Sequence, residues 1–392
     1  MQSKFIIISL LLLLTVSSKS QTSLDLLFES VIKNNKTIKS YGLYNHWQKQ
    51  ATKVGLTPAD PEVEFGYFPG NTDAIGTKKV FGITQSFNFP TTYVHKNKLA
   101  KQAALMADTE LQKNSQKILL QTWKCWAKAI YYNNKNKVFN DRKSQAKKLL
   151  EYYEKKQLNG DATQLEVNKA KLFLIDIENK VRLQNSLAQQ NNEELKNLNG
   201  GLPITIADTI FTNSILESWG EIAQKLKEKH TDIILAKQNQ FITNENLKLS
   251  KSAWLPSFTI GYESESIMGD TYSGFKAGIS IPLWQQKGAV STHKAQIAFI
   301  EHQSDELNLN LLMAYKQKYM HVSVLLANLS AFKKSLSQMN NDYLLSRSLE
   351  LGQISAIEYF MELNYFYEIT DQLFNLELEY QLNFAELYDF TL

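Results

Sequence analysis

Residues that interrupt secondary structure are scarce in this 392-residue sequence and are confined to a few places. The chain has seven prolines, and none of them lies between Pro90 and Pro203 or after Pro282. Glycine is also rare in these two stretches, which are rich in lysine, glutamate, glutamine, leucine and alanine. Because proline and glycine are the residues least compatible with a helix interior, this composition predicts long α-helices.

Cysteine is limited to Cys125, which excludes an intramolecular disulfide. Apolar residues surround it at helical spacing, namely Leu119, Trp123, Trp126 and Ile130, and no histidine lies near it in sequence to activate the thiol. We therefore interpret Cys125 as a packed structural residue. The six histidines lack metal-ligand spacing, and there is no nucleophile motif or phosphate-binding glycine loop. The sequence thus predicts no enzyme, no metal site and no cofactor.

The net charge is also low, and long apolar runs are few. The formal charge is only +4, with both signs mixed along the helical stretches, which argues against nucleic-acid binding. At the N-terminus Lys4 precedes an apolar run, Phe5 to Val16, and the small residues Ser18 and Ser20. This pattern predicts a secretory signal peptide over residues 1–20, too short in its apolar part to span a membrane. No later run is long enough for a transmembrane helix, so membrane insertion would require β-strands.

The prolines and glycines recur in two halves of the chain, which indicates an internal duplication. Two segments of alternating polarity, "PEVEFGYF" at 61–68 and "PSFTIGYE" at 256–263, share a proline and a Gly-Tyr pair. Each is followed by a second alternating segment containing Gly-Ile. We predict a first repeat over 21–205 with strands at about 61–68 and 78–89, and a second over 206–392 with strands at about 256–266 and 272–284.

Each repeat also has one point where its helical stretch folds back. Both points have a glycine, then a hydroxyl residue, then a glutamate: Gly160, Thr163 and Glu166 in "QLNGDATQLE", and Gly352, Ser355 and Glu358 in "ELGQISAIEYF". Glycine commonly ends a helix, and Ser or Thr followed three residues later by Glu is a capping box that begins the next one. We predict hairpin tips near 160 and 352.

The lengths of the helical stretches agree with this arrangement. Residues 92–157 and 289–351 would each form a helix of roughly 95–100 Å. The remaining runs, 22–54 with 161–198 and 214–253 with 353–392, add up in pairs to about the same length. We therefore predict that two shorter helices stack end to end beside each long one.

Each predicted strand has one apolar and one polar face. This pattern fits a half-buried strand, and it fits equally a membrane-barrel strand of about 9–11 residues with its polar face toward a wet lumen. Four strands cannot close a barrel, and open edges are not tolerated in lipid, so several copies would have to share one barrel; three copies would give twelve strands. Glu64, Glu263 and Lys276 would then line the lumen; the alternative is that they are ordinary solvated charges.

With these features the whole mature chain resembles the TolC family of outer-membrane efflux proteins, and in particular its heavy-metal CzcC/CusC-like branch. The most specific strings are "KSAWLPSFTIGYE", "AGISIPLW" and the two tip strings, in the family's order and spacing. The resemblance implies a homotrimer. Its transmembrane β part would be one 12-stranded barrel in the outer membrane, shared by the three copies. Its mostly α-helical part would be a tunnel that crosses the periplasm.

The resemblance also implies a passive exit duct. Its partners would be outer-membrane lipid, a periplasmic adaptor (membrane fusion) protein and an inner-membrane pump of the RND or ABC type. The resemblance to the heavy-metal branch makes metal cations candidate substrates. A second interpretation is a periplasmic coiled-coil scaffold or adaptor without a membrane barrel, which explains the helices but leaves the four alternating strands unexplained.

Family members often carry acidic residues that ring the periplasmic aperture near the second tip. Glu358 falls on one such position, but the next one is Met361 here, with Glu362 adjacent, so a two-ring acidic gate does not follow. The candidate tip and aperture residues are therefore Gly160, Glu166, Gly352, Glu358 and Glu362. The capping-box interpretation explains Glu166 and Glu358 without any gate.

Overall fold

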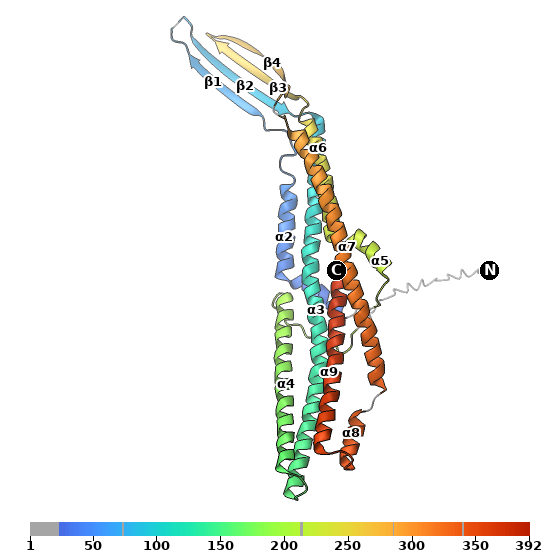
Figure 1. Ribbon diagram of the computed structural model, residues 1–392. Helices are drawn as coiled ribbons and strands as arrows, with labels where there is room; N and C mark the ends of the chain where they lie inside the picture. The colour runs from blue at the N-terminus through green and yellow to red at the C-terminus, as the bar shows by residue number, and fades with distance from the viewer. Residues whose placement is uncertain (1–22, 73, 212–214, 285, 339–340) are drawn as a thin grey trace, which may run out of the picture.

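A tall helical body carries a four-stranded sheet at one end (Figure 1). The computed structural model describes residues 23–72, 74–211, 215–284, 286–338 and 341–392, so the expected signal peptide lies outside the described residues. The expectation of a mostly helical fold with four antiparallel strands is confirmed. In chain order the elements are α1 Ser23–Asn34, α2 Lys36–Ala51, β1 Glu62–Pro69, β2 Thr77–Phe87, α3 Pro90–Leu158, α4 Gln164–Leu198, α5 Trp219–Lys229, α6 Thr231–Ser252, β3 Ser257–Ile267, β4 Asp270–Ser280, α7 Ala289–Ser337, α8 Asn341–Glu350, α9 Ala356–Leu387 and the short 3-10 helix η1 Asp389–Thr391.

The sheet has the strand order β1-β2-β3-β4, and every neighbouring pair is antiparallel. The two predicted hairpins are joined through β2 and β3, which run side by side from Lys78 opposite Ile267 to Phe87 opposite Phe258. β4 ends at Ser280, four residues before the predicted end at 284. Pro282 explains the difference, because proline has no N–H to donate to a neighbouring strand.

The helices stack as their lengths predict. α3 is 69 residues long and therefore spans about 100 Å. α2 and α4 lie one above the other along it, and α6 and α9 lie one above the other along α7 (Figure 1). Each short pair thus covers most of one long helix, which gives the body a nearly constant thickness.

The second long helix is shorter than expected. Instead of one helix over 289–351, α7 ends at Ser337 and α8 begins at Asn341, with residues 339–340 outside the described part. The sequence here is "SQMNNDY". Asparagine and aspartate have low intrinsic helix propensity, so this composition favours a helix boundary here.

Two further boundaries divide the shorter runs. Asn35 separates α1 from α2, and its side chain accepts a hydrogen bond from Ile38 N at 2.9 Å. His230 separates α5 from α6, and its Nδ1 accepts one from Asp232 N at 3.2 Å. Both residues therefore end one helix and cap the next without a glycine or proline.

The lower part of the body has its own apolar core between α3, α4 and α9. Phe360 is only 2% exposed, and its ring lies 5.3 Å from that of Phe173 and 6.2 Å from that of Tyr153. Beside this core the buried Arg142 binds Asp371 at 3.0 Å and lies over the ring of Tyr367. α9 is therefore held to α3 and α4 by aromatic packing and a partly buried ion pair.

None of the helices in the described part of the chain is both long and apolar enough to cross a membrane.

Truncating the core aromatic should loosen this lower part. Phe360→Ala removes a buried ring and leaves a cavity, so we expect the free energy of unfolding to fall by about 3–5 kcal/mol. Urea denaturation followed by circular dichroism measures it. Met361→Ala is the matched control, because Met361 is adjacent on the same helix and 63% exposed. Equal losses in the two variants would contradict the placement of this core.

Candidate functional sites on the sheet and at the hairpin tips

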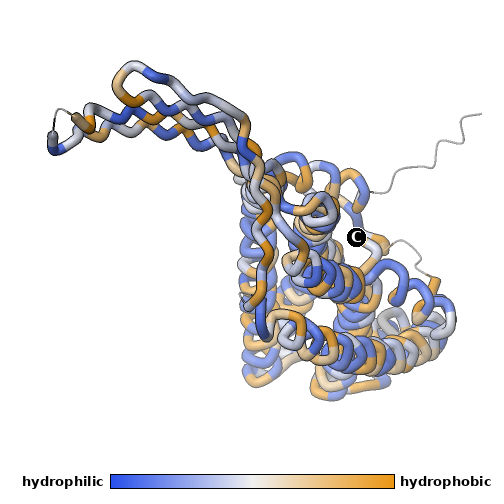
Figure 2. Tube along the Cα trace, turned by 90° about the horizontal axis from the view of Figure 1, so that it is seen from above, coloured by the Kyte–Doolittle hydropathy of each residue, from blue (hydrophilic) through white to orange (hydrophobic). Residues whose placement is uncertain are grey.

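One face of the sheet is apolar and uncovered in the single chain. Pairing across the strands aligns Val63, Ile83, Tyr262 and Phe275 in one row. Phe275 is 93% exposed and Val63 is 65% exposed. Seen from above, the sheet extends away from the helices instead of packing on them (Figure 2). Such an exposed apolar face on an ordered sheet indicates a surface that contacts another apolar medium or chain.

The outer edges of β1 and β4 are unpaired among the described residues. Each of these strands has a hydrogen-bonded neighbour on one side only. The free sides present rows of N–H and C=O groups, which pair readily with a strand of another chain. The sheet therefore has one free edge along β1 and another along β4.

The opposite face is polar and charged. Glu64, Gly82, Glu263 and Gly274 form one row across the sheet, and Lys276 lies in the next row beside Gly261. The structure thus places the three predicted lumen residues on one face. Lys276 Nζ lies 2.8 Å from Glu263 Oε2, so these two are joined directly.

The structure adds a second ion pair to this face that we had not predicted. Lys78 Nζ lies 2.7 Å from Glu265 Oε1, across β2 and β3. The alternation of polarity alone places Lys78 on the polar face. Its partner depends on the register between the two halves of the chain, which the sequence does not specify.

Both tips end in the same backbone geometry. Gly160 has φ 81° and Gly352 has φ 69°, values that only glycine adopts without strain. At the first tip Gly160 N donates to Gln157 O and Asp161 N donates to Lys156 O. At the second tip the same two bonds are Gly352 N to Leu349 O and Gln353 N to Ser348 O. This pair of bonds defines a Schellman ending at each tip.

The helices that follow the tips begin with the predicted capping boxes. Thr163 N donates to Glu166 Oε2, and Ser355 N donates to Glu358 Oε2, both at 2.7 Å. These backbone bonds, with the Thr163 and Ser355 hydroxyls, hold the pKa of each glutamate below its ordinary value. Both carboxylates therefore point back at their own helix start. Glu362 is exposed about one turn further along α9 and takes no part in the box.

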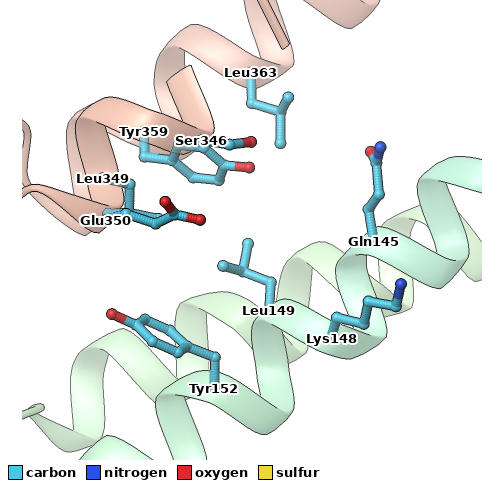
Figure 3. A pocket seen from close by; sticks show the side chains of 9 residues that line it. All are labelled: Gln145, Lys148, Leu149, Tyr152, Ser346, Leu349, Glu350, Tyr359 and Leu363. Carbon is cyan, nitrogen blue, oxygen red and sulfur yellow. The ribbon is translucent and has the colours of Figure 1, made fainter. Parts of the chain in front are cut away.

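A groove opens near the second tip (Figure 3). It has a volume of about 350 Å³ and lies between α3 and the α8–α9 hairpin. The side chains that line it include Leu149 and Tyr152 from α3, Leu349 and Glu350 from α8, and Tyr359 from α9. We had not predicted this groove, because its walls come from three helices that are distant in sequence.

The described residues give little support for a metal site or for a reactive thiol. Within them, no group of three or more His, Cys, Asp or Glu side chains gathers as a metal site. Cys125 is 1% exposed, as expected for a structural thiol, and burial raises its pKa to about 12. At neutral pH the thiol therefore stays protonated and unreactive.

The fold is similar to those of several solved membrane channels, although no family model and no curated protein matches the sequence. The channel-forming protein CusC has 15% identity, with 93% of this chain and 91% of that chain covered at a TM-score of 0.74. A membrane protein from Pseudomonas aeruginosa has 12% identity, with 94% and 92% covered at 0.75. The outer-membrane protein VceC from Vibrio cholerae has 13% identity, with 94% and 93% covered at 0.70. At these identities the similarity concerns the fold.

Removing the capping carboxylate should open the start of α9. We expect Glu358→Ala to speed amide hydrogen exchange over residues 355–359, whereas Glu358→Gln keeps an acceptor oxygen and stays close to wild type. The folded pKa lies below the ordinary value of 4.5, so the stabilisation is complete above that pH. The part of it that depends on the charge is lost as pH falls through the folded pKa, and the wild type then exchanges like Glu358→Gln, because a protonated carboxyl is neutral and keeps an acceptor oxygen.

Glu362→Ala is the control for this experiment, since its carboxylate makes no capping bond. If Glu358→Gln exchanges as fast as Glu358→Ala, the charge and not the hydrogen bond stabilises the tip.

Proposed function

We propose that this chain is one subunit of an outer-membrane exit duct in a tripartite efflux system, of the TolC family and without enzymatic activity. The observation that carries the proposal is a four-stranded sheet with one uncovered apolar face and two unpaired edges. The fold it shares with solved outer-membrane channels supports the same conclusion. In this proposal the sheet lies in the outer membrane and the helices extend into the periplasm.

The unpaired edges specify how the copies would assemble. In lipid every backbone N–H and C=O needs a partner, so β4 of one copy would pair with β1 of the next. A ring of three copies closes a barrel of twelve strands with no free edge. The apolar face, with Phe275 at 93% exposure, then meets lipid. The polar face, with Glu64, Glu263 and Lys276, then lines the water-filled lumen.

The helical body would continue this barrel as a tunnel. α3 alone spans about 100 Å from the foot of the sheet to the first tip. The tips, with Gly160, Glu166, Gly352, Glu358 and Glu362, would then lie at the far end of the tunnel and meet a periplasmic adaptor. The adaptor connects the duct to an inner-membrane pump of the RND or ABC type, which supplies the energy. The duct itself conducts passively.

The alternative of a periplasmic scaffold or adaptor without a membrane barrel is not favoured. A soluble protein rarely leaves a large, ordered apolar sheet face exposed together with two open edges, because both promote aggregation. A scaffold has no use for either feature, whereas a shared barrel uses both.

Cell fractionation and electrophoresis distinguish these functions. We expect the full chain, expressed in a Gram-negative host, to enter the outer-membrane fraction as a trimer that dissociates into monomers only on heating. The unbroken backbone hydrogen bonds around a closed barrel are the physical reason for this resistance. A protein that is recovered in the soluble periplasmic fraction, and that stays monomeric without detergent, would support the scaffold and reject the duct.

For the cargo we propose metal cations, on the basis of the heavy-metal-type sequence strings. Deleting the gene should therefore raise sensitivity to zinc, cobalt, cadmium or copper, measured as growth inhibition across a panel of metals, detergents, dyes and antibiotics. Complementation with the wild-type gene is the control. Sensitivity confined to organic compounds would reject metals as cargo and leave the exit-duct function standing.

A further inference from the structure

Acidic residues are scarce where the sheet joins the helices: four segments there contain none, although Asp60 directly follows the first of them and Glu245 directly precedes the third. We call these segments the neck; they are residues 49–59, 88–101, 246–256 and 281–294. The chain has 39 Asp and Glu among 392 residues, so four such segments at one level of the molecule are not expected from composition. Nine lysines lie in the neck: Lys49, Lys53, Lys96, Lys98, Lys101, Lys248, Lys251, Lys287 and Lys294.

Three of the neck segments meet where the sheet joins the helices, and the first runs from the upper end of α2 up to this junction (Figure 1). Lys251 lies one residue before the end of α6, and Lys287 lies two residues before the start of α7. Lys294, in α7, is about 8 Å further down. All three ammonium groups belong to exposed residues, and within the described part of the chain none of the three takes part in a salt bridge.

The nearest carboxylate does not neutralise this charge. Glu245, on α6 just below the neck, is 2% exposed. It is already bonded to Lys248 at 2.5 Å and to His95 at 2.9 Å. Lys49 is likewise paired with Asp108 at 2.6 Å. The other seven neck lysines, among them Lys251, Lys287 and Lys294, take part in no salt bridge with the described residues and leave a positive surface.

Exposed apolar and aromatic side chains lie at the same level. The alternation of β4, with Phe275 and Ile279 on the apolar face, continues past the end of the strand through Ile281 and Leu283. Trp284 follows directly, outside this alternation, and is 76% exposed. Tryptophan at the end of an apolar strand is typical of the boundary between the hydrocarbon and the headgroups of a bilayer.

A cavity at the foot of the sheet adds room for a polar group. It has a volume of about 380 Å³ and is lined by Asn88, Thr92, Ser252 and Ser257, with Leu283 and Trp284 at the same site. The Thr92 hydroxyl already donates to Ser252 Oγ, and the Ser252 hydroxyl donates to Leu249 O. The Asn88 amide and the Ser257 hydroxyl are therefore the groups that would donate to phosphate oxygens. Two residues that line the cavity, Ser252 and Gln286, are adjacent in sequence to Lys251 and Lys287.

We propose that the neck binds the headgroups of anionic phospholipids in the periplasmic leaflet and so fixes the depth of the barrel in the membrane. This inference rests on the proposed exit-duct function. Lysines near an anionic membrane surface each contribute favourably to binding, and Trp284 marks where the hydrocarbon ends. Phospholipid phosphate is chosen over other anions because the charge, the apolar strand end and the aromatic residue coincide at one level.

The first test compares lipids on the full chain purified in detergent. We expect phosphatidylglycerol, but not phosphatidylethanolamine, to raise the melting temperature. In the variant K251Q/K287Q/K294Q the phosphatidylglycerol concentration for half-maximal stabilisation should rise on the order of tenfold or more. The control K137Q/K147Q/K334Q removes three exposed lysines from the lower body and should respond as the wild type does.

Three results would overturn the proposal. The first is a wild type that responds equally to both lipids. The second is a neck variant that keeps the full response to phosphatidylglycerol. The third is a neck variant whose lipid response is unchanged while the anion preference of its channel falls, which would place these lysines in the lumen.

A second test separates this proposal from the proposed function. Because Cys125 is buried and its pKa is about 12, an introduced cysteine is the only reactive one. We place a fluorophore at F275C, W284C or the control L309C, which lies about 30 Å below the start of α7, in vesicles of phosphatidylethanolamine and phosphatidylglycerol. We expect acyl-chain spin labels to quench position 275 and headgroup spin labels to quench position 284, with no quenching at 309.

The pattern of quenching identifies which idea fails. Quenching at 275 without quenching at 284 rejects the neck as a lipid-binding level and leaves the barrel in place. Absence of quenching at both positions rejects the membrane barrel itself, and with it the inference.

Discussion

The unpaired edges of β1 and β4 are the constraint on which the proposed assembly depends. A strand in lipid has no water with which to satisfy its N–H and C=O groups, so an open sheet cannot remain alone there. With four strands per chain, closure requires other copies. The number of helices around the tunnel and the number of tips at its end then follow from the same closure. One hydrogen-bonding requirement at the sheet thus requires the proposed duct to be a closed ring of copies.

The height of the body follows from a second constraint, the matching of helix lengths. α3 is continuous from the foot of the sheet to the first tip, so it determines the distance between the sheet and this tip. The shorter helices beside the long ones have to end at defined points. Asn35 ends α1 and begins α2, and His230 ends α5 and begins α6. Each of these polar side chains caps the following helix. The second tip repeats both the glycine and the capping box of the first.

Much of this could be predicted from the sequence because the signals are local. Proline, glycine and alternation locate the strands, and a glycine followed by Thr163 and Glu166 or by Ser355 and Glu358 locates each tip. The remaining features depend on contacts between distant segments. The groove beside Tyr152 is made by three helices, and the pairing of Lys78 with Glu265 requires the register of β2 against β3. The end of α7 was also missed, since a few Asn and Asp residues are a weak signal beside a long helical run.

The charges of the chain are distributed by level, and each level has a different role. On the sheet, lysine and glutamate pair across the polar face, as Lys276 and Glu263 do. In the neck, Lys248 and Lys49 are paired with Glu245 and Asp108, whereas the exposed Lys251, Lys287 and Lys294 are in no salt bridge with the described residues. At the tips, Glu166 and Glu358 are bonded to their own helix starts, so a carboxylate in these positions stabilises the turn whether or not it also faces a pore. A charge at a tip is therefore not by itself a gate. The effect of the hydrogen bond has to be separated from the effect of the charge. Replacing the glutamate with glutamine does this, because glutamine keeps the acceptor oxygen and removes the charge.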